Sequence, residues 1–370
     1  NDYGFEQVFS RQVEGLGRRG DVLLALGSPW SRADYADVVR RLQRTTGMRF
    51  GLLVYDLIPL LRPEFCDRHL VRIFSAWYGS VLPLADRVFA ISRATADDVA
   101  AFAERRGFAL RSAPRPIPIG TGFAAGLLEQ GPPAPLPAGL SPGSYALAVS
   151  TIEARKNHVL LFRVWRYLLE NRPAASVPKL VFAGRVGWLV ADLMQQIANT
   201  RNLDGHLVVV PEPSDAELAA LYRGCRFTLF PSLYEGWGLP ITESLGFGKP
   251  CLASDRTSMP EAGGALSRYA DPEHVGAWVD AVARLIDDPG DLAAWEARVR
   301  RDFAPVPWSE TAAALRALTT AWSSACRKRE RSAEEKGRPP PCRNGSAARR
   351  SAARSREASA APTLRSVRAS

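Results

Sequence analysis

Two glutamates bracket a glycine-rich turn near the middle of the chain. Glu235 and Glu243 are separated by seven residues that begin with Gly-Trp-Gly. An apolar run at 226–230 predicts a strand before them, and Pro240 predicts a helix start because proline lacks an N–H that would be unpaired there. Glycines permit close backbone approach, and free N–H groups favour anionic oxygens. The segment suits a phosphorylated, hydroxyl-rich ligand, although a tight turn with a dipole-compensating glutamate fits the same residues.

A second turn carries two adjacent cations. Arg155 and Lys156 lie between an expected strand at 145–150 and an expected helix at 157–171. Cations and free N–H groups at a helix N-terminus suit a pyrophosphate. An ordinary solvated Arg-Lys pair is the alternative, and the second phosphate-suited turn favours the binding interpretation.

Composition indicates a globular protein with most of its excess charge at one end. The 370 residues are 46% apolar and carry a net charge of +10, enough length for two core-bearing domains. Residues 327–370 hold 13 basic and 4 acidic groups, whereas the rest is nearly neutral. This tail lacks core-forming side chains and is expected to be disordered, with anionic lipid as a candidate contact. Nucleic-acid binding is not expected.

Metal and disulfide chemistry find little support in the residue spacing. The five cysteines form no CxxC pair, and the four histidines show no metal-ligand spacing. Scattered cysteines fit a reducing cytosol. No apolar run approaches the roughly 20 residues that a membrane-spanning helix needs.

Strand-like and helix-like segments alternate along most of the chain. In the first part, helix starts are expected at Ser31–Asp34 and Thr95–Asp98. The first part contains expected strands at 21–26, 50–55 and 87–91, and expected helices up to residue 45 and at 67–82. The later expected strands are 145–150, 179–183, 206–210, 226–230 and 250–254. The later expected helices are 157–171, 188–200, 214–223 (with a Ser214–Glu217 capping box), 239–247, 272–288, 291–302 and 308–325.

Near-continuous apolar strands alternating with helices predict a parallel sheet covered on both faces. Ligands of such sheets bind beyond the C-terminal strand ends at a topological switch point. The turns at 150–156 and 231–238 both follow strands, so we expect them to meet there.

Several segments together resemble family 4 glycosyltransferases, retaining enzymes of the two-Rossmann GT-B fold, and most resemble their bacterial mannosyltransferase-like members. The likeness spans roughly residues 20–325. It is carried by Thr151–Asn157, Ser214–Tyr222, Pro231–Glu243 and Ser254–Gly263, with Tyr55–Pro59, Arg62–Glu64 and Ser92–Asp98 before them.

The resemblance implies an α/β fold of two Rossmann-like domains facing a cleft. The implied parts are a partial acceptor domain (1–118), a Pro/Gly-rich linker (119–144), a nucleotide-sugar domain (145–305), a closing helix (306–326) and the basic tail (327–370). Family members carry one or two strands before the point where this chain starts at Asn1. An N-terminally truncated acceptor domain with an exposed sheet edge is therefore expected.

The resemblance also implies site roles. Glu243 would bind ribose hydroxyls of a nucleotide sugar, and Glu235 would lie near the hexose hydroxyls. Lys156, helped by Arg155, would neutralise the departing diphosphate, which stabilises the charge of the transition state. The backbone N–H groups that would touch sugar and phosphate belong to Gly236, Trp237, Gly238 and Leu239. No metal or cofactor is implied.

One departure concerns the turn in the first domain. Many relatives have a histidine where this chain has Tyr55, so no histidine is assigned to catalysis. Asp56 is an acceptor-side candidate, and a structural cap of its own turn is the equal alternative.

The leading hypothesis is transfer of a hexosyl unit, with mannose from GDP-mannose as the expected donor. The acceptor would be a glycan or lipid-linked glycan at the cytosolic membrane face. The alternatives are a nucleotide-sugar epimerase of the same fold, which needs further acid and base residues, and a truncated, non-catalytic nucleotide-sugar binder.

Overall fold

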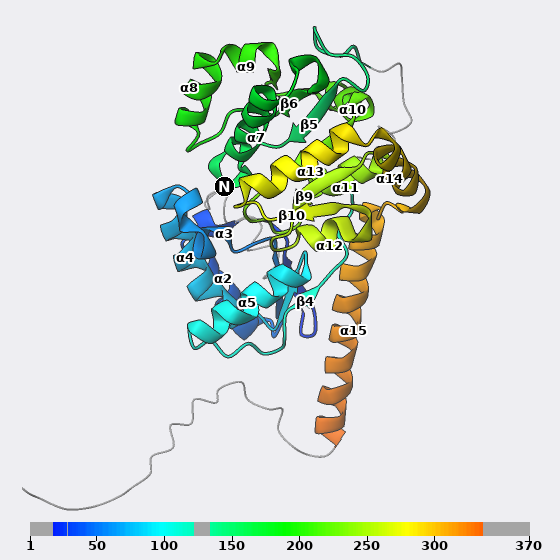
Figure 1. Ribbon diagram of the computed structural model, residues 1–370. Helices are drawn as coiled ribbons and strands as arrows, with labels where there is room; N and C mark the ends of the chain where they lie inside the picture. Colours follow the sequence, from blue (N-terminus) through cyan, green and yellow to red (C-terminus); the bar gives the residue numbers. More distant parts are fainter. Residues whose placement is uncertain (1–17, 28, 122–133, 336–370) are drawn as a thin grey trace, which may run out of the picture. The chain divides into compact units, whose positions relative to one another are not determined.

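The computed structural model describes residues 18–27, 29–121 and 134–335. These residues contain two parallel sheets (Figure 1). The N-terminal sheet has the order β1-β2-β3-β4, and every neighbouring pair in it is parallel. Its strands are β1 (Val22–Ala25), β2 (Arg49–Val54), β3 (Arg87–Ala90) and β4 (Arg115–Pro116). The first three follow the apolar runs of the sequence, whereas the two-residue β4 has no such run and was not predicted.

The helices of the N-terminal part pack on β2 and β3 around one apolar cluster, which contains Phe50, Leu52, Trp77 and Val88. Four aromatic rings of this cluster contact one another in tilted or edge-on pairs, the geometry that ring quadrupoles favour. The elements are η2 (Pro29–Ser31), α2 (Tyr35–Thr45), α3 (Ile58–Leu61), η3 (Pro63–Phe65), α4 (Arg68–Val81), η4 (Leu82–Leu84) and α5 (Arg93–Arg105).

The C-terminal sheet has six parallel strands in the order β10-β9-β8-β5-β6-β7. The chain runs outward from β5 in one direction and then returns to build the other side, so the strand order reverses between β5 and β8. The strands are β5 (Tyr145–Val149), β6 (Lys179–Ala183), β7 (Leu207–Val210), β8 (Phe227–Phe230), β9 (Cys251–Ser254) and β10 (Arg268–Ala270). Five of these were predicted, and β10 was missed because it is a three-residue, partly buried edge strand.

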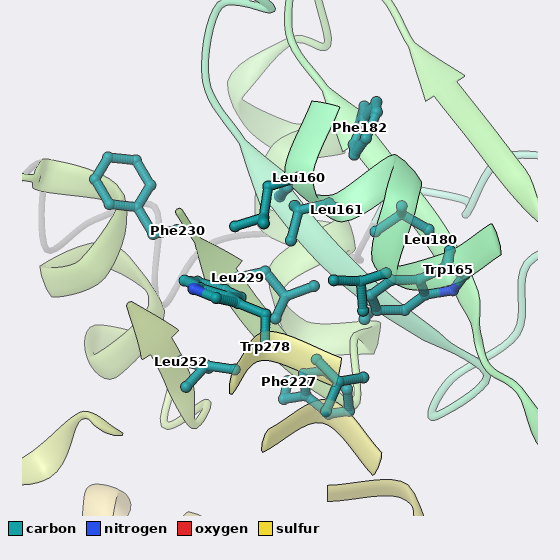
Figure 2. Packing of buried hydrophobic residues seen from close by; sticks show 14 of the residues in the cluster. Leu160, Leu161, Trp165, Leu180, Phe182, Phe227, Leu229, Phe230, Leu252 and Trp278 are labelled. Carbon is teal, nitrogen blue, oxygen red and sulfur yellow. The ribbon is translucent and has the colours of Figure 1, made fainter. Parts of the chain in front are cut away.

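Side chains of the C-terminal sheet alternate between two apolar clusters, as the pleat requires. In β5, Ala146 and Ala148 belong to the cluster shared with α7 and α13, whereas Tyr145 and Leu147 face the cluster shared with α10. Both faces are therefore covered, as predicted. Figure 2 shows part of the larger cluster, where Trp165 and Trp278 lie among leucines of the helices and strands.

The helices of this part largely follow the predicted ranges. They are η5 (Ala154–Lys156), α7 (His158–Asn171), η6 (Ala174–Ser176), α8 (Ala191–Asn199), α9 (Arg201–Gly205), α10 (Asp215–Gly224), α11 (Leu239–Gly246), α12 (Met259–Gly263), η7 (Gly264–Leu266), α13 (Val275–Asp287), α14 (Pro289–Asp302) and α15 (Trp308–Glu335). The predicted capping box is present at the start of α10, where Ser214 and Glu217 exchange hydrogen bonds.

Two predicted helix starts in the N-terminal part are wrong. Ser31 lies in η2, and Asp34 precedes α2 without capping it because its carboxylate binds Arg32 at 3.1 Å. Helix α5 begins at Arg93, and its N-cap is Ser92, whose hydroxyl accepts from the Thr95 N–H at 2.9 Å. Thr95 therefore lies inside the first turn instead of before it.

The C-terminal boundary also differs from the prediction. Helix α15 continues to Glu335, so the part of the predicted disordered tail between residues 327 and 335 is helical. Arg, Lys, Glu and Ala dominate this stretch, and these residues favour a helix even without a buried face. The rest of the tail, 336–370, lies outside the described residues, as does 122–133 of the predicted linker.

The cap of α5 can be tested directly. We expect Ser92→Ala to lower the free energy of unfolding by about 1 kcal/mol, because the Thr95 N–H would lose its acceptor in a buried position. Ser31→Ala is the matched control and should stay within about 0.5 kcal/mol of the wild type. Equal losses in urea-unfolding curves of the two variants would contradict this assignment of the cap.

Candidate functional site

The two turns predicted to share a ligand lie side by side. Strands β5 and β8 are neighbours, and the turn after each strand contacts the other. The Leu233 N–H donates to the Arg155 carbonyl at 2.9 Å, and the Asn157 side-chain amide donates to the Pro231 carbonyl at 3.2 Å. Asn157 adopts the left-handed conformation (φ 60°) that lets the chain reverse into α7. The prediction that these crossovers meet at one rim is confirmed.

Four charged side chains form a continuous cluster where the turns meet. Lys156 Nζ lies 2.5 Å from one Glu235 oxygen, and Arg155 Nη1 lies 2.9 Å from the other. Arg155 also contacts Glu153 at 2.7 Å through its second nitrogen. The cations are only 14% and 15% exposed, so the carboxylates compensate two charges that are largely removed from water. We will call Glu153, Arg155, Lys156 and Glu235 the charge cluster.

Ionisation of Glu235 is governed by these neighbours. Burial alone would raise its pKa, but the charges of Lys156 and Arg155 and hydrogen bonds from Lys156 and Ser232 hold the pKa below its ordinary value of 4.5. The Ser232 hydroxyl donates to Glu235 at 2.6 Å. Glu235 is therefore a carboxylate at neutral pH, fixed by three donors.

Sequence reasoning missed Glu153. It is 3% exposed and binds the guanidinium two residues further on. Its signal was present, because an acid two positions before an Arg-Lys pair at a strand end can fold back onto the arginine. The sequence alone could not show that this acid is buried instead of solvated.

A later segment holds the backbone of the Glu235 turn. The Ser258 hydroxyl lies 2.9 Å from both the Glu235 and the Trp237 carbonyls, and the Thr257 hydroxyl accepts from the Glu235 N–H at 3.1 Å. Ser258 is fully buried. The segment between β9 and α12 thus positions the glutamate turn, a function that sequence analysis did not assign to it.

A cavity of about 310 Å³ lies beside the charge cluster. This volume is at the lower end of the range for small-molecule sites. The Trp237 indole N–H is buried here without a partner among the described residues. Most of the predicted site residues line the cavity, together with apolar side chains: Tyr55, Asp56, Ile91, Ile119, Lys156, Glu235, Gly236, Trp237, Gly238, Leu239, Pro240 and Trp308.

Gly236 allows the N-terminal turn to close over this cavity. A Cβ at position 236 would lie 2.1 Å from the Tyr55 carbonyl oxygen and 3.1 Å from the Asp56 Cβ. Gly238 has a left-handed φ of 111° as it enters α11, a conformation that side chains disfavour. Both glycines of the turn therefore meet a geometric requirement.

Asp56 caps its own turn and also lines the cavity. One carboxylate oxygen accepts from the Ile58 N–H at 3.0 Å, which stabilises the turn before α3. The same side chain lines the cavity, and burial raises its pKa despite that hydrogen bond and the nearby Arg155 and Lys156. A carboxyl group with a raised pKa next to a cavity can exchange a proton with a hydroxyl.

Glu243 lies apart from the cavity lining, on the second turn of α11. Its carboxylate accepts from the Tyr222 hydroxyl at 2.9 Å. Burial raises its pKa, against the lowering effect of that hydrogen bond. The structure thus brings Lys156, Arg155, Glu235 and Asp56 together, and places Glu243 one helical turn beyond them.

The histidine nearest to the cluster is unsuited to proton transfer. His158 follows the second turn and is 2% exposed, and burial with the nearby Lys156 charge lowers its pKa to about 3. It remains neutral at physiological pH, in line with the absence of any histidine from the proposed site.

Hydrogen bonds connect the N-terminal and C-terminal parts around the cavity. The Glu261 carboxylate accepts from the Arg93 and Ala94 N–H groups, both at 2.8 Å, at the start of α5. The Thr95 hydroxyl lies 3.3 Å from the Gly236 carbonyl, and the Tyr234 hydroxyl donates to Asp98.

In residues 18–27, 29–121 and 134–335, no cluster of three or more His, Cys, Asp or Glu side chains is arranged to hold a metal ion. Within the same part of the chain, none of the helices has the length and apolar character needed to cross a membrane.

Comparison with known proteins gives related sequences. Residues 141–302 match the family model described as glycosyl transferases group 1. The O-antigen chain mannosyltransferase B of Escherichia coli is 33% identical over 144 residues, which are 39% of this chain and 37% of that protein. The serotype-specific mannosyltransferase WbdA of the same species is 28% identical over 222 residues, 57% of this chain and 26% of the relative. The chain thus spans well under half of these relatives.

Solved structures give similar folds at low identity. HepE of Anabaena in complex with UDP has a TM-score of 0.60 and 15% identity, covering 85% of this chain and 81% of that one. A glycosyltransferase from Rickettsia africae has a TM-score of 0.57 and 14% identity, covering 85% and 79%.

Removal of the Glu235 charge is expected to destabilise the fold. Glu235→Gln would leave two largely buried cations with one carboxylate, which should lower the free energy of unfolding by about 3 kcal/mol at pH 7. The folded-state pKa lies below the ordinary 4.5, so this stabilisation is present above pH 4.5 and is lost as the pH falls through the lowered value. Urea unfolding at several pH values should show the variant and wild type converging in acid. A constant difference would contradict the assignment.

Removal of the Glu243 charge is expected to stabilise the fold, the opposite of the effect expected at Glu235. Burial opposes the charge of Glu243, so ionisation costs stability as the pH rises above 4.5. Glu243→Gln keeps an acceptor for Tyr222 without the charge, and should raise the free energy of unfolding by up to about 1 kcal/mol at pH 7. Thermal unfolding of the variant and the wild type would be measured at pH 7. A variant less stable than the wild type would contradict the view that the Glu243 charge is unfavourable to folding.

Proposed function

Because the chain belongs to the family 4 glycosyltransferases and has their GT-B fold of two Rossmann-like domains, we propose that it transfers a hexosyl unit from a nucleotide-diphosphate sugar to a glycan or lipid-linked glycan. We infer mannose as the hexose and GDP-mannose as the donor. The similarity to two Escherichia coli mannosyltransferases supports the choice of mannose. The observation that carries the proposal is the charge cluster, which lies where the turns after β5 and β8 meet.

The charge cluster supports a role in departure of the nucleotide diphosphate. Breaking the anomeric bond places negative charge on the diphosphate, and fixed cations stabilise this charge more in the transition state than before it. Arg155 and Lys156 are suited to that task because carboxylates already hold them in place, so little reorganisation is needed. The start of α11 at Leu239, which also lines the cavity, adds backbone N–H groups there.

The carboxylates are suited to the hydroxyl groups of the donor. We propose that Glu235 binds hexose hydroxyls, exchanging part of its contact with Lys156 as the diphosphate takes that cation. Glu243, next along α11, is proposed to bind the ribose. Burial disfavours the charged form of Glu243 and raises its pKa. A ligand hydroxyl that donates to the carboxylate would stabilise the charged form.

Asp56 is proposed to face the acceptor. It comes from the N-terminal part and lines the same cavity as the start of α11, and its raised pKa suits a group that hydrogen-bonds an incoming hydroxyl. Retention at the anomeric carbon follows from family membership and is part of the proposal. Action at the cytosolic face of the membrane, with the basic tail near anionic lipid, is a further expectation.

Donor binding is testable by thermal shift. GDP, UDP, dTDP and their sugars would each be added to the purified chain. A ligand present at 100 times its dissociation constant should stabilise the protein by about 2.7 kcal/mol. We expect the largest shift with GDP-mannose. The absence of a shift with any nucleotide sugar would contradict the proposal. A larger shift with a UDP-sugar than with GDP-mannose would identify the UDP-sugar as the donor instead.

Transfer itself is testable with two lysine variants. Lys156→Ala should lower kcat about a hundredfold, because one fixed cation at the leaving group is lost. Lys179→Ala is the control, since Lys179 begins β6 at the opposite end of the sheet and binds the Gly139 carbonyl. Conversion of the donor to an epimeric sugar when no acceptor is present would indicate an epimerase. Donor binding without any turnover would indicate a non-catalytic binder.

A further inference from the structure

An exposed apolar loop follows β6 at the rim of the C-terminal sheet. Val186, Trp188 and Leu189 are 47%, 47% and 61% exposed, although large apolar side chains in the described part of the chain are mostly buried. Three exposed apolar residues within four positions form a local apolar surface, a feature that is common at binding sites.

This loop is attached to the charge cluster. It pairs with the turn that carries Arg155: Ile152 bridges Val186, the Gly187 N–H donates to the Ile152 carbonyl at 2.9 Å, and a Cβ on Gly187 would lie 2.8 Å from the Thr151 side chain. Residues 185–188 therefore continue the rim on which the cluster lies. A ligand extending outward from the cavity along this rim would reach the loop.

The Trp188 ring is held in a fixed orientation. Its indole N–H donates to the Phe65 carbonyl at 2.7 Å, in the 3-10 helix η3 of the N-terminal part. The polar edge is thus satisfied within the protein, and nearly half of the side chain remains exposed. A fixed ring that spans both parts of the chain is a pre-organised surface for a flat, partly apolar partner.

Charged residues of both signs neighbour Phe65, which binds the indole, and the loop itself. Glu64 and Arg62 lie beside Phe65, and the guanidinium of Arg62 lies 4.7 Å from the Phe65 ring centre. Arg185 precedes Trp188 in the chain and Asp192 follows it, and both are exposed. Mixed charges near an aromatic face suit a neutral, hydroxyl-rich ligand, whereas a site for anionic lipid would be dominated by cations.

We propose that Trp188 is a stacking platform for a pyranose unit of the glycan acceptor, with Leu189 and Val186 extending its apolar face. The C–H face of a sugar ring would lie on the indole while its hydroxyl groups bind the flanking charged side chains. This inference rests on the proposed function for the identity of the ligand. It adds a binding site for acceptor units outside the cavity where transfer is proposed.

The test is direct binding of an α-linked mannotriose, measured by calorimetry on the full chain. Trp188→Ala should weaken binding about tenfold, the order expected for loss of one aromatic stacking contact. Trp188→Phe keeps an aromatic face but loses the indole donor, and should lie within about threefold of the wild type. Tyr167→Ala is the matched control, an exposed aromatic residue on α7 that should leave binding unchanged.

The outcomes separate this inference from the proposed function. Unchanged GDP-mannose shifts in Trp188→Ala, together with weaker mannotriose binding, would support it. Equal mannotriose affinity in Trp188→Ala and the wild type, or no binding by the wild type, would overturn it even if transfer were established. Loss of binding to phosphatidylglycerol vesicles in Trp188→Ala, with mannotriose binding unchanged, would make the loop a membrane contact instead.

Discussion

The structure around the candidate site depends on compensation of two adjacent cations that are largely removed from water. Arg155 and Lys156 come from one short turn, so they repel each other unless carboxylates lie between and beside them. Glu153 is supplied locally, but Glu235 comes from a different crossover. The pairing of β5 with β8 brings that carboxylate within reach. Sheet topology, and not local sequence, therefore completes the cluster.

The same constraint explains why so many hydrogen bonds converge on one turn. A glutamate that holds two cations must have a fixed backbone, and Ser232, Thr257 and Ser258 each bind the side chain or the main chain around it. Gly236 then lets the Tyr55 carbonyl approach without a side chain between them. Charge compensation and close approach of the N-terminal part are therefore achieved by two consecutive residues, Glu235 and Gly236.

Much of this arrangement could be predicted because its signals are local. Apolar runs bounded by turn residues indicated eight of the ten strands in the described residues. Because parallel strands all end at the same edge of a sheet, the turns that follow them lie at one rim. The missed strands, β4 and β10, are two and three residues long. The helix start at Ser92 was missed because Thr95 is an equally good capping residue in sequence, and only backbone geometry separates them.

The remaining differences concern contacts between distant residues and the length of the last helix. Nothing near Glu243 in sequence indicates that Tyr222 binds it. The extension of α15 to Glu335 agrees with the helix propensity of its residues and conflicts with a composition typical of disorder. The roles of Glu153 and Trp188 depend on which side of a turn is buried, which sequence spacing does not specify.

Because Glu261 binds the first turn of α5, the hydrogen bonding of that helix start depends on the position of the C-terminal part beside it. The free N–H groups at a helix start require acceptors. Here the Glu261 carboxylate, from the C-terminal part of the chain, accepts from two of these N–H groups in α5. Any hinge motion that widened the cavity would expose the Arg93 and Ala94 amides to solvent. Hydrogen exchange at these two amides would therefore report how often the cavity opens, with or without a bound ligand.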